Sequence, residues 1–120
     1  MARTNLAAQT LAGAYPALPL GGGSADFTWT TADTVNQNMT SLVNAKTVLL
    51  ARNLGTGAHT ITITSVADTL NRVGHITAYS IGQDKISRFG AFQTVGWANA
   101  GKLDFEADSA EVEFAVLQLP

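Results

Sequence analysis

The densest run of ionisable side chains comes near the C-terminus, where Asp104, Glu106 and Asp108 alternate along the sequence. Alternate residues of a strand share a face, and we expect Glu111 and Glu113 to lie opposite them across a hairpin. Such oxygen-rich groups suit calcium, and paired carboxylates can hydrolyse glycosides. The spacing matches no calcium-binding loop, and an open surface lacks the burial that raises a carboxyl pKa. We therefore interpret the five carboxylates as a solvated outer face.

The two histidines, His59 and His75, each stand at the start of an expected strand. Neither has a carboxylate or a third histidine at a spacing typical of zinc sites, so we interpret both as polar residues at strand starts. The chain has no cysteine, which excludes disulfides and thiolate sites. It has no Gly-x-Ser-x-Gly nucleophile motif, and the glycines at 21–23 lack the lysine of a phosphate-binding loop. We expect no catalytic, metal or cofactor site, and a protein that is not an enzyme.

Two aromatic residues of an expected loop, Phe92 and Trp97, are candidates for surface contacts. An exposed indole ring offers a sugar a platform to stack on, and Trp97 with Tyr79 forms the basis of a carbohydrate-binding hypothesis. In the alternative, which we favour, Trp97 closes one end of the hydrophobic core. Asp68 and Arg72 share one loop and are expected to pair there, which contributes little stability at a surface.

Eight segments have the alternation or apolar content of strands, and turn residues separate them. A spacing of ~8–12 residues is typical of sandwiches and barrels. We predict an all-β domain over 24–120, an antiparallel β-sandwich or a jelly-roll-like barrel, with 46–53 and 59–66 paired as a hairpin. The last segment is apolar on both faces and is expected to be central. The predicted strands are 26–30, 38–44, 46–53, 59–66, 75–81, 85–89, 102–106 and 111–119.

The segment before this domain has a different character. Residues 1–20 contain one charge, Arg3, and prolines at 16 and 19 exclude a helix interior or a central strand there. The glycines at 21–23 form a flexible joint. We predict an extended arm and joint over 1–23 that contacts a partner or a sister subunit through Leu6, Leu11, Tyr15, Pro16, Leu18, Pro19 and Leu20.

The charge content also favours a protein covered by partners. Charged residues make up 13% of the 120 residues, against roughly 25% in an average soluble domain. The net charge of -2 and the scattered basic residues argue against nucleic-acid binding. No apolar run approaches the ~20 residues that span a bilayer, and polar residues at 5, 9 and 10 interrupt any signal peptide. We expect synthesis in the cytoplasm.

Short strings along nearly the full length resemble a family of small virion proteins of tailed bacteriophages. These strings are MART at 1–4, YPALPL at 15–20, TSVAD at 64–68, ITAYS at 76–80, GW at 96–97 and FAVLQLP at 114–120. The resemblance implies a structural component of the phage head.

The leading hypothesis is a capsid decoration, or cement, protein on the virion surface. It would bind and stabilise the shell of major capsid protein through its arm and β-domain, as a homo-oligomer with a trimer favoured, since several weak arms act together. The alternatives are a neck or tail structural protein and a carbohydrate-binding module.

Overall fold

The computed structural model describes residues 2–11 and 26–120, which form β-strands and turns and no helix. Within these residues there is accordingly no helix that could cross a membrane. The strands are β1 (Thr4–Asn5), β2 (Gln9–Thr10), β3 (Thr30–Thr31), β4 (Asn38–Ser41), β5 (Thr47–Asn53), β6 (His59–Thr64), β7 (Ile76–Ile81), β8 (Ile86–Phe92), β9 (Lys102–Ala107) and β10 (Val112–Gln118).

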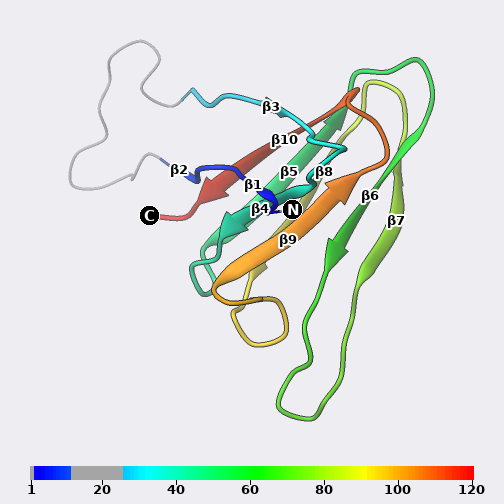
Figure 1. Cartoon of the computed structure of the whole chain (residues 1–120). Helices are drawn as coiled ribbons and strands as arrows, with labels where there is room; N and C mark the ends of the chain where they lie inside the picture. Colours follow the sequence, from blue (N-terminus) through cyan, green and yellow to red (C-terminus); the bar gives the residue numbers. More distant parts are fainter. Residues whose placement is uncertain (1, 12–25) are drawn as a thin grey trace.

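Two sheets pack face to face as a sandwich (Figure 1). Sheet I has the order β1-β4-β9-β6-β7, and sheet II has the order β2-β10-β5-β8, with β3 also paired to β10. All pairs are antiparallel except β1 with β4 and β2 with β10, which are parallel. The all-β sandwich prediction is confirmed. The sheets are mixed rather than purely antiparallel, and they do not close into a barrel.

The eight strands β3 to β10 follow the jelly-roll order. Antiparallel pairs join β3 to β10, β4 to β9, β5 to β8 and β6 to β7, so that the first of these eight strands pairs with the last, the second with the seventh, and so on inwards. This long ribbon then folds so that β10 pairs with β5 in one sheet and β9 with β6 in the other. An eight-strand double sheet of this kind is a jelly roll.

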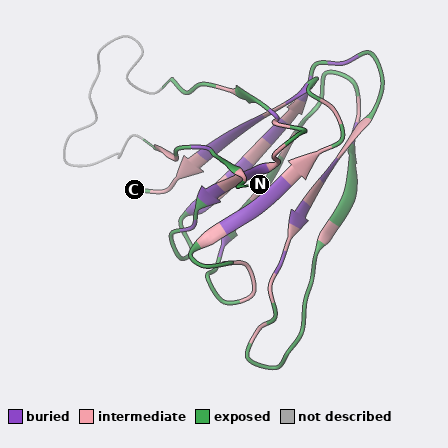
Figure 2. Ribbon diagram, viewed as in Figure 1, coloured by how far each residue is buried: buried purple, intermediate pink, exposed green. Residues whose placement is uncertain are grey.

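The core lies between the sheets and follows the alternation of side chains along each strand (Figure 2). In β5, Leu49 and Ala51 point inwards and are fully buried, whereas Val48 and Leu50, which alternate with them, are half-buried. Phe105 of sheet I meets Phe114 of sheet II edge to face, with ring centres 4.8 Å apart. The other large core residues are Leu6, Leu42, Ile61, Ile63, Ile81, Phe92, Leu103, Val112 and Val116.

The predicted hairpin of 46–53 with 59–66 is wrong, because β5 and β6 lie in opposite sheets. The chain crosses between the sheets at Asn53, whose side chain is fully buried. Its amide donates to the backbone oxygens of Gly57 (2.7 Å) and Ile81 (2.9 Å), and its oxygen accepts from the Gly55 N–H at 2.8 Å. These bonds hold a corner rather than a hairpin turn.

The prediction of a strand over 26–30 holds only for its last residue. Thr28 makes its hydrogen bonds with a side chain instead of a strand: the Gln9 amide donates to its carbonyl (2.9 Å) and accepts from its N–H (2.8 Å). Regular pairing therefore begins at Thr30, opposite Phe114 of β10.

The prediction of an extended arm is wrong for residues 2–11, which belong to the sandwich. β1 adds to the edge of sheet I and β2 to sheet II, so the segment between them crosses from one sheet to the other. Leu6 lies on this crossing and is only 5% exposed, and its carbonyl accepts from the buried Thr40 hydroxyl at 2.7 Å. Leu6 therefore contacts the core of its own chain and not a partner. The expected contacts at Tyr15, Pro16, Leu18, Pro19 and Leu20, and the glycines at 21–23, lie outside the described residues.

Candidate functional site

The outer surface of sheet II carries apolar side chains on its central strands, and the exposed Arg88 of β8 lies beside Leu50 on the same side. Register places Leu117 of β10 beside Val48 of β5, and Ala115 beside Leu50. These side chains alternate with core residues, so they point away from the core. Ile86 at the start of β8 continues the surface beyond Arg52 and is 61% exposed. We call this surface the apolar face; it comprises Phe27, Trp29, Val48, Leu50, Ile86, Leu117 and Ala115, of which Ala115 is only 1% exposed.

Aromatic rings cover the charges at one corner of the apolar face. Phe27 and Trp29 pack with ring centres 5.4 Å apart, and the Arg52 guanidinium lies 4.6 Å from the centre of the Trp29 ring. Arg52 Nε also donates to the Glu113 carboxylate at 2.7 Å. Because the ion pair is internally neutral and partly covered by indole, it interrupts the apolar surface little.

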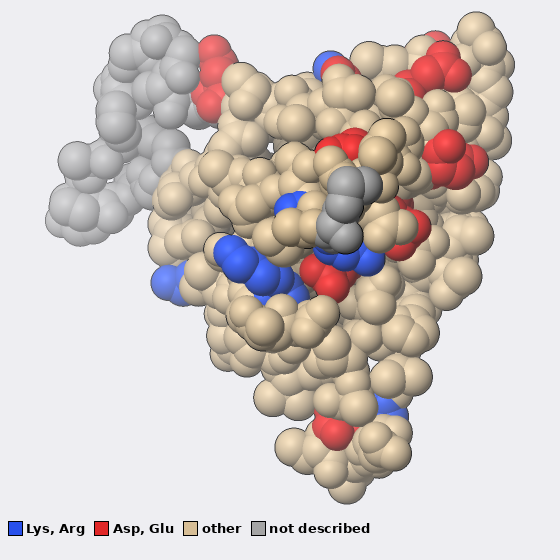
Figure 3. All heavy atoms as spheres, in the orientation of Figure 1, with Lys and Arg blue, Asp and Glu red and all other residues tan. Residues whose placement is uncertain are grey.

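The opposite outer surface, on sheet I, is polar. Threonines occupy the outward positions of β6, and Figure 3 shows acidic and basic side chains on this side of the molecule. Arg3 lies between two carboxylates, 3.8 Å from Asp104 and 3.7 Å from Glu106, and donates to the backbone oxygens of Asn38 and Phe105. Asp104 is only 9% exposed, so the expectation of a solvated face is wrong at this residue.

The expected opposition of Asp104, Glu106 and Asp108 to Glu111 and Glu113 is wrong. Their strands, β9 and β10, lie in opposite sheets, and Glu113 pairs with Arg52 instead.

Asp108 and Glu111 meet at a histidine instead. Asp108 lies 3.2 Å from His59 Nδ1, and Glu111 lies 3.1 Å from His59 Nε2. Sequence spacing gave no sign of this cluster because its members are up to 52 positions apart. Among residues 2–11 and 26–120, no group of three or more histidine or acidic side chains is placed to hold a metal ion.

His75 stands just before β7, as expected of a polar residue at a strand start. Its Nδ1 accepts a hydrogen bond from the Ser65 N–H at 3.0 Å, and the Ser65 hydroxyl accepts from the Gly74 N–H at 2.7 Å. These bonds join the two ends of the loop between β6 and β7.

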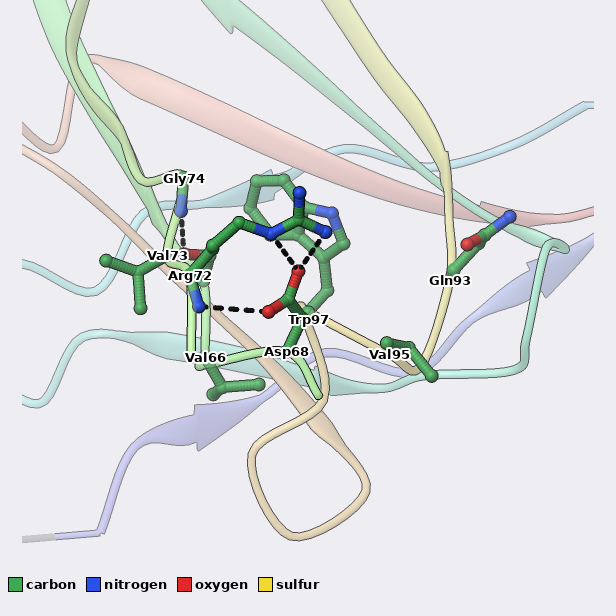
Figure 4. A pocket seen from close by; sticks show the side chains of 10 residues that line it. Val66, Asp68, Arg72, Val73, Gly74, Gln93, Val95 and Trp97 are labelled. Carbon is green, nitrogen blue, oxygen red and sulfur yellow. Dashed lines mark hydrogen bonds and ion pairs between the residues drawn. The ribbon is translucent and has the colours of Figure 1, made fainter. Parts of the chain in front are cut away.

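A pocket of 420 Å³ opens beside this loop (Figure 4). Trp97 lines it and also packs edge to face on Phe92, with ring centres 5.0 Å apart. Phe92 is 4% exposed, so the expectation that it makes surface contacts is wrong. Trp97 packs against the core at this end, as we favoured from the sequence. Tyr79, its partner in the carbohydrate-binding hypothesis, packs on Phe89 and does not line the pocket.

The expected pair of Asp68 and Arg72 is confirmed at the rim of the pocket. The Asp68 carboxylate accepts from the backbone N–H groups of Leu70 (2.8 Å) and Arg72 (2.9 Å), and from Arg72 Nε at 2.8 Å. These bonds, with the backbone N–H of Arg72 contributing most, hold the pKa of Asp68 below its ordinary value. The pair closes the loop between β6 and β7 where it lines the pocket.

Comparison of the chain with protein-family models, with curated proteins and with solved structures finds no match in any of the three. The surfaces that remain as candidates for function are the apolar face of sheet II and the pocket at Trp97.

Proposed function

We propose that this protein is a non-enzymatic structural subunit of a tailed-bacteriophage virion, a decoration (cement) protein that sits on the shell of major capsid protein. The apolar face of sheet II is the observation that carries the proposal. The sandwich already buries one apolar side of this sheet in its core. The chain covers the second apolar side only in part and leaves Ile86 and Phe27 exposed, and exposed apolar patches mark interaction sites.

Two further features support this assignment. Jelly rolls recur in viral capsid proteins, although the same fold serves other functions. The resemblance of the sequence to small phage virion proteins names the partner class, which the fold alone leaves open. The major capsid protein is accordingly the partner we propose.

The free energies of burial and of association favour several copies of the protein acting together. Full burial of a large apolar side chain contributes ~1.5–3 kcal/mol, and the members of the apolar face other than Ile86 and Phe27 are already half-buried or more. Association costs ~4–15 kcal/mol of lost freedom, so a single face binds weakly. A trimer presents three faces to a symmetric shell, and linked contacts strengthen one another. Leu11, which is 38% exposed, offers further apolar surface for this contact.

The test is binding to shells of the phage that encodes the protein, assembled without it. Ile86→Lys places a charge on the apolar face at its β8 edge, at a position that is 61% exposed and so should spare the fold. Val35→Lys is the matched control, because Val35 is 75% exposed and lies in a turn away from that face. We expect the unchanged protein and Val35→Lys to co-sediment with shells to saturation, and Ile86→Lys to bind about tenfold more weakly.

If Ile86→Lys bound shells as tightly as the unchanged protein, the apolar face would not be the surface that contacts the shell. The number of copies per purified virion tests the location of the protein. Many copies would indicate a decoration protein, whereas a few copies would indicate a neck or tail protein.

A further inference from the structure

We propose that the pocket at Trp97 binds a neutral saccharide, with one sugar ring against the indole. This proposal uses none of the apolar face and stands independently of the virion assignment. The volume of 420 Å³ falls within the ~300–1,000 Å³ range of small-ligand pockets.

The first argument is that the aromatic wall is already fixed in place. The indole packs on the buried Phe92 at an interplanar angle of 66°. The Val66 N–H donates to the Gly96 carbonyl at 2.8 Å, which ties the loop before β7 to the loop that carries Trp97. A ring held in this way loses little freedom when a ligand stacks on it, and such preorganisation favours binding.

The second argument is the mixture of surfaces. Val66, Val73 and Val95 line the pocket beside the indole, and the last two are more than half exposed at its rim. Polar groups lie among them: the Gln93 amide and the guanidinium of Arg72, which is 70% exposed as a side chain. A pyranose ring has an apolar C–H face and a hydroxyl edge, so it matches an apolar wall flanked by hydrogen-bonding groups.

The third argument is charge, which decides the class of saccharide. Asp68 and Arg72 are the only charged residues of the lining, and they pair with each other. Asp68 accepts four contacts, from two backbone N–H groups and from Nε and Nη2 of Arg72, which fill its lone pairs. Arg72 keeps donors beyond the two that Asp68 uses, because a guanidinium has five N–H groups. The lining is therefore neutral and rich in donors, which suits hydroxyl oxygens better than an anion.

The chain contains two tryptophans, Trp29 and Trp97, and this permits a direct readout. In Trp29→Phe the indole of Trp97 is the only one, and its fluorescence reports on the pocket. The probes are methyl glycosides and neutral oligosaccharides, titrated into the full chain. We expect a saturable change for at least one neutral saccharide. Trp97→Phe, which keeps Trp29, should give no saturable signal, and by calorimetry should bind the same saccharide about tenfold more weakly.

A second pair of variants tests the donors. Arg72→Gln should weaken binding several-fold, whereas Arg88→Gln should leave it unchanged because Arg88 is exposed on β8 and does not line the pocket. Thermal unfolding of each variant, followed by circular dichroism, shows whether it is folded.

The absence of a saturable change with every neutral saccharide would overturn the proposal. Equal calorimetric affinity of Trp97→Phe would overturn it as well, since binding would then lie elsewhere. Tighter binding of inorganic phosphate or of a uronic acid than of any neutral sugar would refute the charge argument and the ligand class with it. Because shell binding is tested at Ile86, outside the pocket, failure of one proposal is distinguishable from failure of the other.

Discussion

Glu111 Oε1 lies 3.1 Å from His59 Nε2, and the space that allows this contact is provided by Gly55. A Cβ on residue 55 would stand 2.9 Å from the Glu111 carboxylate and 2.9 Å from His59 Nε2. The absence of a side chain at Gly55 therefore holds open the place where the loop before β10 meets the start of β6.

Gly55→Ala is expected to displace the Glu111 carboxylate, the flexible end of a side chain, and so to break the contact with His59. Exposed pairs contribute ~0.2–1 kcal/mol, so the loss of stability is of that order. Urea unfolding of Gly55→Ala, Glu111→Gln and the double variant checks this prediction. The two changes should not add, because each removes the same contact; full additivity would show that Gly55 acts elsewhere.

Leu6→Ala is expected to destabilise the sandwich by ~2–5 kcal/mol, as for other buried leucines, because Leu6 is 5% exposed and fills the crossing between the sheets. Leu11→Ala is the matched control at an exposed position (38%) and should change stability by less than ~0.5 kcal/mol. Urea unfolding measures both. If the two variants were equally stable, residues 2–11 would not be docked in solution.

Gly90→Ala is expected to destabilise the protein by ~1–3 kcal/mol or more. Gly90 has φ +123°, which disfavours a side chain, and a Cβ there would lie 2.8 Å from the Thr47 carbonyl, a backbone atom that cannot move aside cheaply. Gly57→Ala is the comparison, since a Cβ at Gly57 meets nothing within 4 Å. Thermal unfolding should separate the two variants clearly, and a melting temperature unchanged by Gly90→Ala would refute this account of the strand.

Acid should destabilise the fold through two carboxyls whose pKa values are lowered from 3.8. For Asp33 the largest cause is the hydrogen bond from the Thr4 hydroxyl, followed by the Asn36 N–H. For Asp68 it is the Arg72 N–H, followed by the Arg72 side chain. A lowered pKa in the folded state means that the stabilisation is complete above the unfolded value of 3.8 and is lost as pH falls through the lower folded value.

Urea unfolding between about pH 6 and about pH 2 measures this loss. Asp33→Asn and Asp68→Asn should each show a shallower fall in stability with acid than the unchanged protein. A slope that neither substitution alters would assign the acid sensitivity to other groups.

The strands were predictable where alternation was strict. Ile61 and Ile63 alternate with threonines, and β6 lies there. The sheet to which each strand belongs was harder to predict from the sequence. The short segment between β5 and β6, for example, fits a hairpin turn and a crossing between sheets equally well. The crossing is shown by the strand pairing, which places β5 and β6 in opposite sheets, and by the buried hydrogen bonds of Asn53 at the corner.

The candidate sites were predictable only in part. Asp68 and Arg72 are four residues apart, and local spacing was enough to expect their pairing. Residues that meet across the fold, such as His59 with Asp108, carry no local signal. The apolar face did leave a local signal in the sequence. Residues 114–117 are apolar at inward and outward positions alike. We interpreted that pattern as a central strand, which the pairing of β10 confirms, but it also indicated a second apolar surface.

The position of β10 has a consequence for how the protein is made. A ribosome delivers β10 after all the other strands, yet β10 pairs with β2, β3 and β5. Sheet II is therefore completed only after β10 is made, because without β10 only its β5 and β8 can pair. Folding dominated by such distant pairings is slow, so we expect the docking of β10 against β2, β3 and β5 to be a late step of folding.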